Sequence, residues 1–266
     1  MTSGASYAEL VKRDRVVVVS AIAVLTTLAW VYTVRIAASM GSMELDSMVA
    51  TMAMPSTRSW SPDDVVFMFG MWVVMMVAMM LPSATPMILL FTRVMQKREV
   101  EGRPFVPTAL FVVGYLLVWV GFSALATLAN WGLHRVDLLS SMMGRTPPLI
   151  SGVVLVLGGA FQWTPLKQAC LNHCRSPMTF LTAHWHDGRA GTLLMGLHHG
   201  LFCVGCCWLL MALLFVLGIM NLPWIAAITV FVLLEKVLPS GQLVSRISGG
   251  ALAAWGITLI VIGLAR

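Results

Sequence analysis

Long apolar segments alternate with short polar ones along the whole chain. Uninterrupted apolar runs cover residues 16–38, 65–91, 106–131, 148–168, 192–218, 222–238 and 249–265. A helix needs about 20 predominantly apolar residues to cross roughly 30 Å of hydrocarbon, and most of these runs supply them. The pattern predicts an all-α fold, a polytopic transmembrane helical bundle of about seven spans that forms a single domain over residues 1–266.

Two of the seven runs are weaker candidates for a span. The run 148–168 contains three glycines, and the run 222–238 is barely long enough, so six spans is the alternative count. Pro82 and Pro86 lie inside the second run. Proline is tolerated in membrane helices when neighbours satisfy the freed backbone groups, so we expect these residues to kink the span without ending it.

Composition agrees with the bilayer as the solvent of this chain. Apolar residues make up 59% of the sequence and charged residues 11%, with a mean hydropathy of +0.88, which does not suit a soluble globule. The net charge is +6, but the 17 Lys and Arg residues are scattered between apolar runs, which argues against nucleic-acid binding. A cytoplasmic N-terminus places twelve of them inside, as the positive-inside rule requires.

The fifth apolar run contains the most informative cluster of polar and sulfur-containing residues. Its members are Met195, His198, His199, Cys203, Cys206, Cys207 and Met211. On a helical projection of 100° per residue, His199, Met195 and the three cysteines share an arc of about 120°, whereas His198 points elsewhere. His199 and Cys207 lie roughly 12 Å apart along the helix axis, so one ion cannot contact all of these groups. Pairs three or four residues apart can converge, and further ligands must come from another helix.

The second apolar run supplies candidate partners for this cluster. Met68, Met71, Met75 and Met79 share an arc of about 80°, with Met76 and Met80 beside it. Met75 and Met79 are the ligands we expect from this helix. Soft sulfur and imidazole select Cu(I) first and then Zn(II) or iron, whereas Ca²⁺ and Mg²⁺ require oxygen ligands. The expected metal is therefore Cu(I).

Packing is the alternative explanation for the sulfur-containing residues. Cysteine behaves as a small buried hydrophobe and methionine fills irregular gaps, so packing explains any single Cys or Met well. Three cysteines within five residues, one turn after a pair of histidines, are a different case. Polar groups inside a membrane carry a desolvation cost, and such a cluster therefore favours a functional role.

The inner connection, residues 164–191, carries further candidate ligands. Cys170 and Cys174 are one helical turn apart with His173 between them, an arrangement suited to a transient metal site or a redox pair. His184 and His186 are weaker candidates, because histidines beside an aromatic residue are common at the membrane interface.

Two features outside these clusters also bear on cation binding. The outer connection, residues 39–64, contains five methionines suited to capturing copper, namely Met40, Met43, Met48, Met52 and Met54. Glu235 lies near the inner end of the sixth run, where it either guides a cation or is solvated together with Lys236.

Several of these strings occur together in a known family. The segments 78–83, 167–177, 196–211 and 235–236, and above all the string His-Gly-x-x-Cys-x-x-Cys-Cys-Trp, resemble a bacterial family of unknown function described as predicted metal-binding integral membrane proteins. The resemblance covers about residues 65–240. It implies a metal site at His199, Cys203, Cys206 and Cys207 in a multi-pass protein of the bacterial cytoplasmic (inner) membrane. The adjacent His198 leaves open which imidazole binds.

Three functions are consistent with the sequence. The leading one is a Cu(I)-handling membrane protein that binds or relays the ion within the bilayer and exchanges it with a periplasmic or cytoplasmic metal chaperone. No motif of a hydrolytic or nucleotide-driven enzyme is visible, so we do not expect an enzyme. The first alternative is a transmembrane thiol oxidoreductase, although two cysteines within a regular helix rarely reach disulfide geometry. The second alternative is a non-catalytic structural membrane subunit.

Overall fold

The computed structural model describes the backbone of residues 3–51, 61–102, 106–135 and 148–265, together with their side chains except at residues 3–14 and 40–51. These residues form ten α-helices and no strand. The helices are α1 (Ser3–Thr51), α2 (Pro62–Val100), α3 (Thr108–Arg135), α4 (Pro148–Phe161), α5 (Pro165–Arg175), α6 (Pro177–Ala183), α7 (Gly188–Ala212), α8 (Leu214–Leu217), α9 (Leu222–Val237) and α10 (Gly241–Leu264). The expected all-α bundle is therefore confirmed for this part of the chain.

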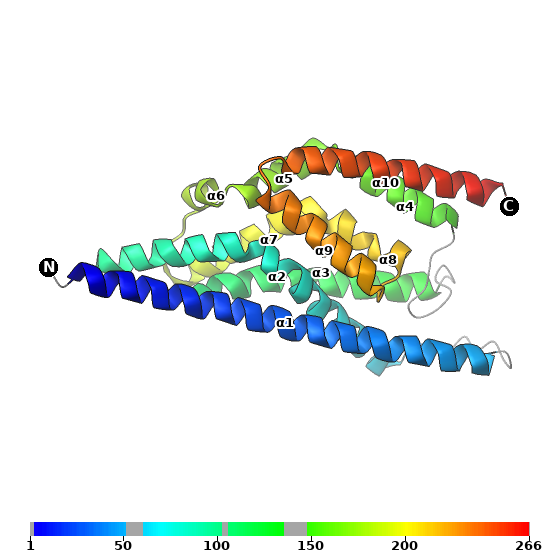
Figure 1. Cartoon of the computed structure of the whole chain (residues 1–266), viewed down its shortest axis with the longest axis horizontal. Helices are drawn as coiled ribbons and strands as arrows, with labels where there is room; N and C mark the ends of the chain where they lie inside the picture. Colours follow the sequence, from blue (N-terminus) through cyan, green and yellow to red (C-terminus); the bar gives the residue numbers. More distant parts are fainter. Residues whose placement is uncertain (1–2, 52–60, 103–105, 136–147, 266) are drawn as a thin grey trace.

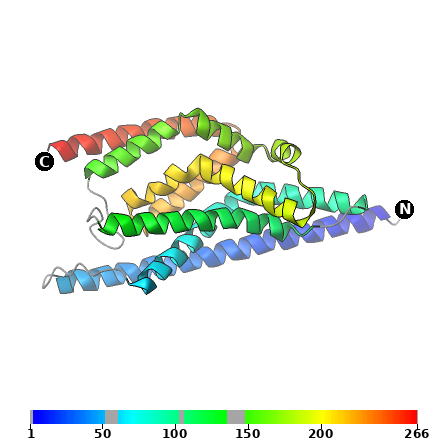
Figure 2. The same cartoon turned by 180° about the vertical axis from the view of Figure 1, so that it is seen from behind.

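The long helices lie side by side in a bundle (Figure 1). α1 packs along α2 on one side, and α4 packs against α10 on the opposite side. Between them, α3 packs against α7, and α9 contacts α2. Figure 2 shows the same order from behind, with the short helix α6 toward the end of the bundle where the N-terminus lies. The interior surrounded by α2, α3, α7 and α9 is where the cysteines of the fifth apolar run are found.

Among the described residues, five helical segments are long and apolar enough to cross a membrane. They are Arg15–Ser39 in α1, the whole of α2, the whole of α3, Gly188–Leu217 across α7 and α8, and the whole of α10. The predicted span 148–168 is broken, because α4 and α5 meet at 62° and give a sixth span only if they cross as one unit. Thr164 caps α5 and Pro165 begins it, which explains why a new helix starts there. The predicted span 222–238 is the 16-residue α9, shorter than a typical span. Helix length and composition therefore support five or six spans.

The two prolines of the second span leave its helix continuous. α2 runs for 39 residues with Pro82 and Pro86 inside it, as expected. Pro82 has no N–H to donate to Ala78 O, four residues earlier. The indole Nε1 of Trp30 on α1 donates to that oxygen at 3.1 Å. A neighbouring helix thus satisfies a backbone group freed by proline, as the low-dielectric interior requires.

Glycine brings two helix pairs into backbone contact. A Cβ added at Gly196 of α7 would lie 2.1 Å from Phe111 O of α3. A Cβ added at Gly152 of α4 would lie 2.6 Å from Gly256 O of α10. Small residues are typical of helix contacts in membranes, where close van der Waals packing replaces the hydrophobic driving force. The glycines that weakened the fourth run as a candidate span therefore have a packing role.

Methionine fills much of the interior, while apolar side chains cover the outside. The buried methionines of α2 are Met68, Met71, Met75, Met76, Met79, Met80, Met87 and Met95. Only 17% of the most apolar window of α1 and 11% of that of α10 is buried within the bundle. Outer helices whose apolar side chains face outward to this extent suit contact with lipid.

Candidate metal-binding thiol site

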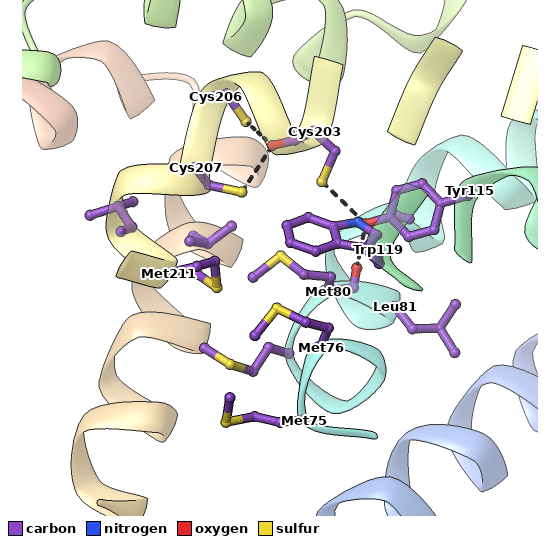
Figure 3. Packing of buried hydrophobic residues seen from close by; sticks show 14 of the residues in the cluster. Met75, Met76, Met80, Leu81, Tyr115, Trp119, Cys203, Cys206, Cys207 and Met211 are labelled. Carbon is purple, nitrogen blue, oxygen red and sulfur yellow. Dashed lines mark hydrogen bonds between the residues drawn. The ribbon is translucent and has the colours of Figure 1, made fainter. Parts of the chain in front are cut away.

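The three cysteines of α7 are buried in the bundle. Cys203, Cys206 and Cys207 are each at most 1% exposed, and His199 and Met195 are buried on the same helix face. The Cys206 and Cys207 thiols donate to the carbonyl oxygen of Cys203 at 3.1 and 2.9 Å (Figure 3). Residues three and four apart share one helix face, so regular helix geometry alone gathers these sulfur atoms. The arc expected from the helical projection is confirmed as a buried face.

The Cys203 sulfur has two polar neighbours on other helices. The Lys236 ammonium of α9 donates to Cys203 Sγ and to Ser83 Oγ of α2, both at 2.9 Å. The Tyr115 hydroxyl of α3 lies 3.2 Å from Cys203 Sγ and donates to Met80 O of α2 at 3.0 Å. In the described part of the chain, no carboxylate lies within ion-pair distance of Lys236. The site therefore presents a buried positive charge to a sulfur atom.

A fourth thiol reaches this group from α5. Cys174 lies close enough to Cys203 and Cys206 to interact with both thiols. Cys170, one turn earlier, lies against the backbone of α7, since a Cβ added at Gly205 would be 2.8 Å from Cys170 Sγ. Both α5 cysteines are half-buried free thiols. The two α5 cysteines, predicted as a pair from their spacing, therefore lie in different environments. Cys174 lies with the α7 thiols, whereas Cys170 packs against the α7 backbone.

A buried ion pair lies on another face of α9. Lys167 of α5 donates to the Glu235 carboxylate oxygens at 2.8 and 3.0 Å and to the side-chain oxygen of Gln162. Ser245 of α10 donates to the same Gln162 oxygen at 2.9 Å. Lys167 is 0% exposed and Glu235 is 1% exposed, so the interpretation of Glu235 as solvated together with Lys236 is wrong. Successive side chains on a helix point about 100° apart, which sends these two neighbours to different helices.

Thioether sulfur lies in the same interior as the thiols. Figure 3 shows Met76 and Met80 of α2 and Met211 of α7 directed into the space beside the α7 cysteines. The predicted ligands Met75 and Met79 are fully buried in the same core. Cysteine and methionine sulfur from two helices therefore surrounds one apolar region, which is a donor set suited to a soft cation.

The candidate histidines lie in different environments. His199 is buried near aromatic rings, including Phe180 at 5.3 Å between centroids, and its Nδ1 has no hydrogen-bond partner among the described residues. His198 points away from the thiols toward the segment after α6, as the projection predicted. His173 stacks on Phe202 of α7, with centroids 4.2 Å apart and planes at 3°. His199 is thus the imidazole on the thiol-bearing face.

The thiols are close but are not preorganised around an ion. No three His, Cys, Asp or Glu side chains in the described ranges form a group that could hold a metal as they stand. One reason is visible at Cys206 and Cys207, whose S–H groups point at the backbone of their own helix. A metal would have to displace these protons and rotate the thiols toward Cys203 or Cys174. The five outer methionines lie outside the residues whose side chains the structure describes, so copper capture there stays a prediction.

Two residues that contact Cys203 were not among the predicted ligands. Lys236 lies near the end of an apolar run beside an acidic residue, and this pattern is typical of a charged pair at the membrane interface. Tyr115 carries no local signal, because a single tyrosine within an apolar run is ordinary. The feature that could have drawn attention to Lys236 is its place within one turn of the apolar core of a predicted span.

The fold and the site define an all-α protein with several helices able to cross a membrane and with buried thiols beside a buried ammonium group. Residues 69–259 match the PpoB2 family of copper chaperones. Because the match covers more than half of the chain, the protein belongs to this copper chaperone family. No match was found among curated proteins or among solved structures. Membership of this family supports a copper-related function, and copper is the metal that the sulfur and imidazole donors predicted.

Proposed function

We propose that the protein holds Cu(I) as cargo on sulfur ligands inside the helix bundle, in the bacterial inner membrane, and hands it on to another protein. The observation that carries this proposal is the contact between the Lys236 ammonium and Cys203 Sγ at 2.9 Å. A buried ammonium group is costly unless a negative charge balances it. A thiolate at Cys203 supplies that charge, and a thiolate is the form of cysteine that binds metal.

Charge balance favours a monovalent ion at this site. A thiol that coordinates a metal loses its proton, so Cu(I) bound by two thiolates carries one net negative charge. Lys236 neutralises that charge. Zn(II) bound by the same two thiolates is neutral, and the ammonium group would then be left unbalanced in a low-dielectric interior. This difference supports Cu(I) as the cargo instead of Zn(II) or iron.

The ligands we assign come from two helices. Cys203 is the first, because it contacts the counter-charge. Either Cys206 or Cys174 is the second, since Cys174 interacts with Cys203 and with Cys206. Cys207, on the same buried face, and the thioethers beside it are alternative partners when the ion exchanges. Exchange between such closely spaced donors lets the ion move without leaving sulfur coordination. This property suits a chaperone that must release copper as well as bind it.

Anaerobic Cu(I) titration of the detergent-purified protein against a chromophoric Cu(I) competitor tests the proposal. Cys203→Ser is expected to weaken binding at least about 100-fold, which corresponds to about 2.7 kcal/mol. Cys170→Ser is the matched control, and we expect it to retain binding because its sulfur packs against Gly205. A protein that binds no Cu(I) contradicts the proposal. If its thiols also oxidise reversibly in pairs, the thiol oxidoreductase becomes the better explanation.

A further inference from the structure

Four of the six histidines gather where α5, α6 and α7 meet, apart from the thiols. The ring centroid of His198 on α7 lies 5.7 Å from that of His184 and 6.4 Å from that of His186. His184 directly follows α6, and its centroid lies 6.0 Å from that of His173 on α5. Neither the ion pairs nor the thiol site uses these imidazoles.

In three of these histidines, a hydrogen bond determines which ring nitrogen is protonated. Nδ1 contacts a backbone carbonyl oxygen at 2.9 Å in His173, at 3.3 Å in His184 and at 2.9 Å in His186. A carbonyl oxygen only accepts, so each ring carries a proton on Nδ1, and the neutral form of such a ring has its lone pair on Nε2. Histidines that bind metals typically donate their other N–H to a carbonyl or carboxylate in this way. The Nδ1 of His198 has no hydrogen-bond partner among the described residues.

The ring separations fit a shared ion. Bonds of about 2.0–2.1 Å put each imidazole centroid about 3.2 Å from the metal, so two centroids lie roughly 5.2 Å apart at a tetrahedral angle and roughly 6.4 Å apart in a linear complex. The His184–His198 separation of 5.7 Å lies inside this range. His184 also stacks on Phe180, with centroids 4.9 Å apart and planes at 18°. Stacking occupies the ring face, whereas a metal binds in the ring plane at the nitrogen, so the two contacts are compatible.

We propose that His184 and His198 bind one Cu(I) ion at a second site, separate from the thiols. Two-coordinate Cu(I) needs only this pair of ligands. Both histidines are half-buried, whereas Cys203 is fully buried. His198 precedes Cys203 by five residues, about 7.5 Å along the helix axis. The imidazole pair is therefore an accessible binding site through which copper enters or leaves the buried sulfur site. This role rests on the proposed function.

X-ray absorption and Cu(I) stoichiometry on the purified full-length chain test the second site. We expect the wild-type protein to bind about two Cu(I) ions, one with sulfur and one with nitrogen neighbours. His184→Gln and His198→Gln should each remove one ion and the Cu–N component, leaving the Cu–S component intact. His134→Gln, at the end of α3, is the matched control and should change neither. The double variant Cys203→Ser/Cys206→Ser should retain the nitrogen-bound ion.

The outcomes separate this inference from the proposed function. Sulfur-bound copper that persists unchanged in both histidine variants, with no Cu–N component in the wild type, overturns the second site alone. Nitrogen-bound copper without any sulfur-bound copper supports the second site and contradicts the thiol site. A wild-type protein that binds no Cu(I) overturns both. The sulfur-bound ion in each histidine variant also reports that the variant has folded.

Discussion

Replacing Lys236 with methionine removes the positive charge beside Cys203 while keeping a long, flexible side chain. In the native site, the ammonium donates to Cys203 Sγ and Ser83 Oγ, both at 2.9 Å. Lys236→Met leaves the sulfur atoms in place, and methionine fits the thioether-rich interior around them. The substitution therefore tests the counter-charge separately from the ligands.

The expected loss follows from the distance between Nζ and Sγ. Two unit charges 2.9 Å apart attract with about 6 kcal/mol at an effective dielectric constant of 20. In a Cu(I) bis-thiolate, two sulfur atoms share the single net negative charge, so about half of this attraction, about 3 kcal/mol, acts between Lys236 and Cys203. The ratio of Cu(I) affinity to Zn(II) affinity should therefore fall about 100-fold, since 1.4 kcal/mol corresponds to tenfold and the metal-free state is common to both metals.

Competition titrations at one fixed pH measure both affinities in the wild type, in Lys236→Met and in Lys236→Arg. The arginine variant keeps the charge and should retain most of the preference for Cu(I) over Zn(II). Lys97→Met, at the exposed end of α2, is the control for loss of a charge elsewhere. An equal loss of affinity for the two metals, or no loss for either, would refute the charge-balance argument. The midpoint of thermal unfolding in detergent reports whether each variant is folded.

Three further substitutions follow from the same contacts. Tyr115→Phe removes the hydroxyl whose proton can turn from Met80 O to a Cys203 thiolate, and should weaken Cu(I) binding by about 1 kcal/mol, roughly fivefold, in the same titration. Glu235→Gln leaves the Lys167 ammonium buried without its carboxylate and should destabilise the fold by about 3–5 kcal/mol, seen as a lower unfolding midpoint; an unchanged midpoint would mean that the pair is solvated. Gly196→Ala should lower the unfolding midpoint because its Cβ would meet the α3 backbone at 2.1 Å, whereas Gly121→Ala, with open space around it, should not.

The apolar pattern predicted much of the fold because one rule governs helices in lipid. Every backbone polar group must be satisfied within the segment, so a long apolar run has few options other than a helix. Each predicted run accordingly overlaps a helix, including α9 and the α4–α5 pair. The predicted run 148–168 extends across the break at residues 162–164, although Gln162 is polar and Thr164 followed by Pro165 is an ordinary helix-start signal.

Local geometry explains which parts of the site could be predicted. The buried face of α7 followed from helix periodicity, since the positions of His199 and the three cysteines depend only on their spacing within one helix. The partners of Cys203 depend on which helices pack together, and hydrophobicity carries little information about that choice. The distinction between Cys170 and Cys174 also required the packing of α5 against α7. Contacts within a helix were thus predictable from this sequence, whereas contacts between helices were not.

The adjacent residues Glu235 and Lys236 show why this limit matters for function. Opposite charges side by side at the end of an apolar run suggest a solvated pair, and that interpretation assigns no role to either residue. In the bundle, Glu235 pairs with Lys167, which leaves the charge of Lys236 free to act on Cys203. If Glu235 neutralised Lys236 instead, a Cu(I) bis-thiolate would lack its counter-charge, and the preference for a monovalent ion would disappear. In the proposed site, the ion pair between α5 and α9 therefore contributes to metal selectivity by keeping the adjacent Glu235 carboxylate from competing for Lys236.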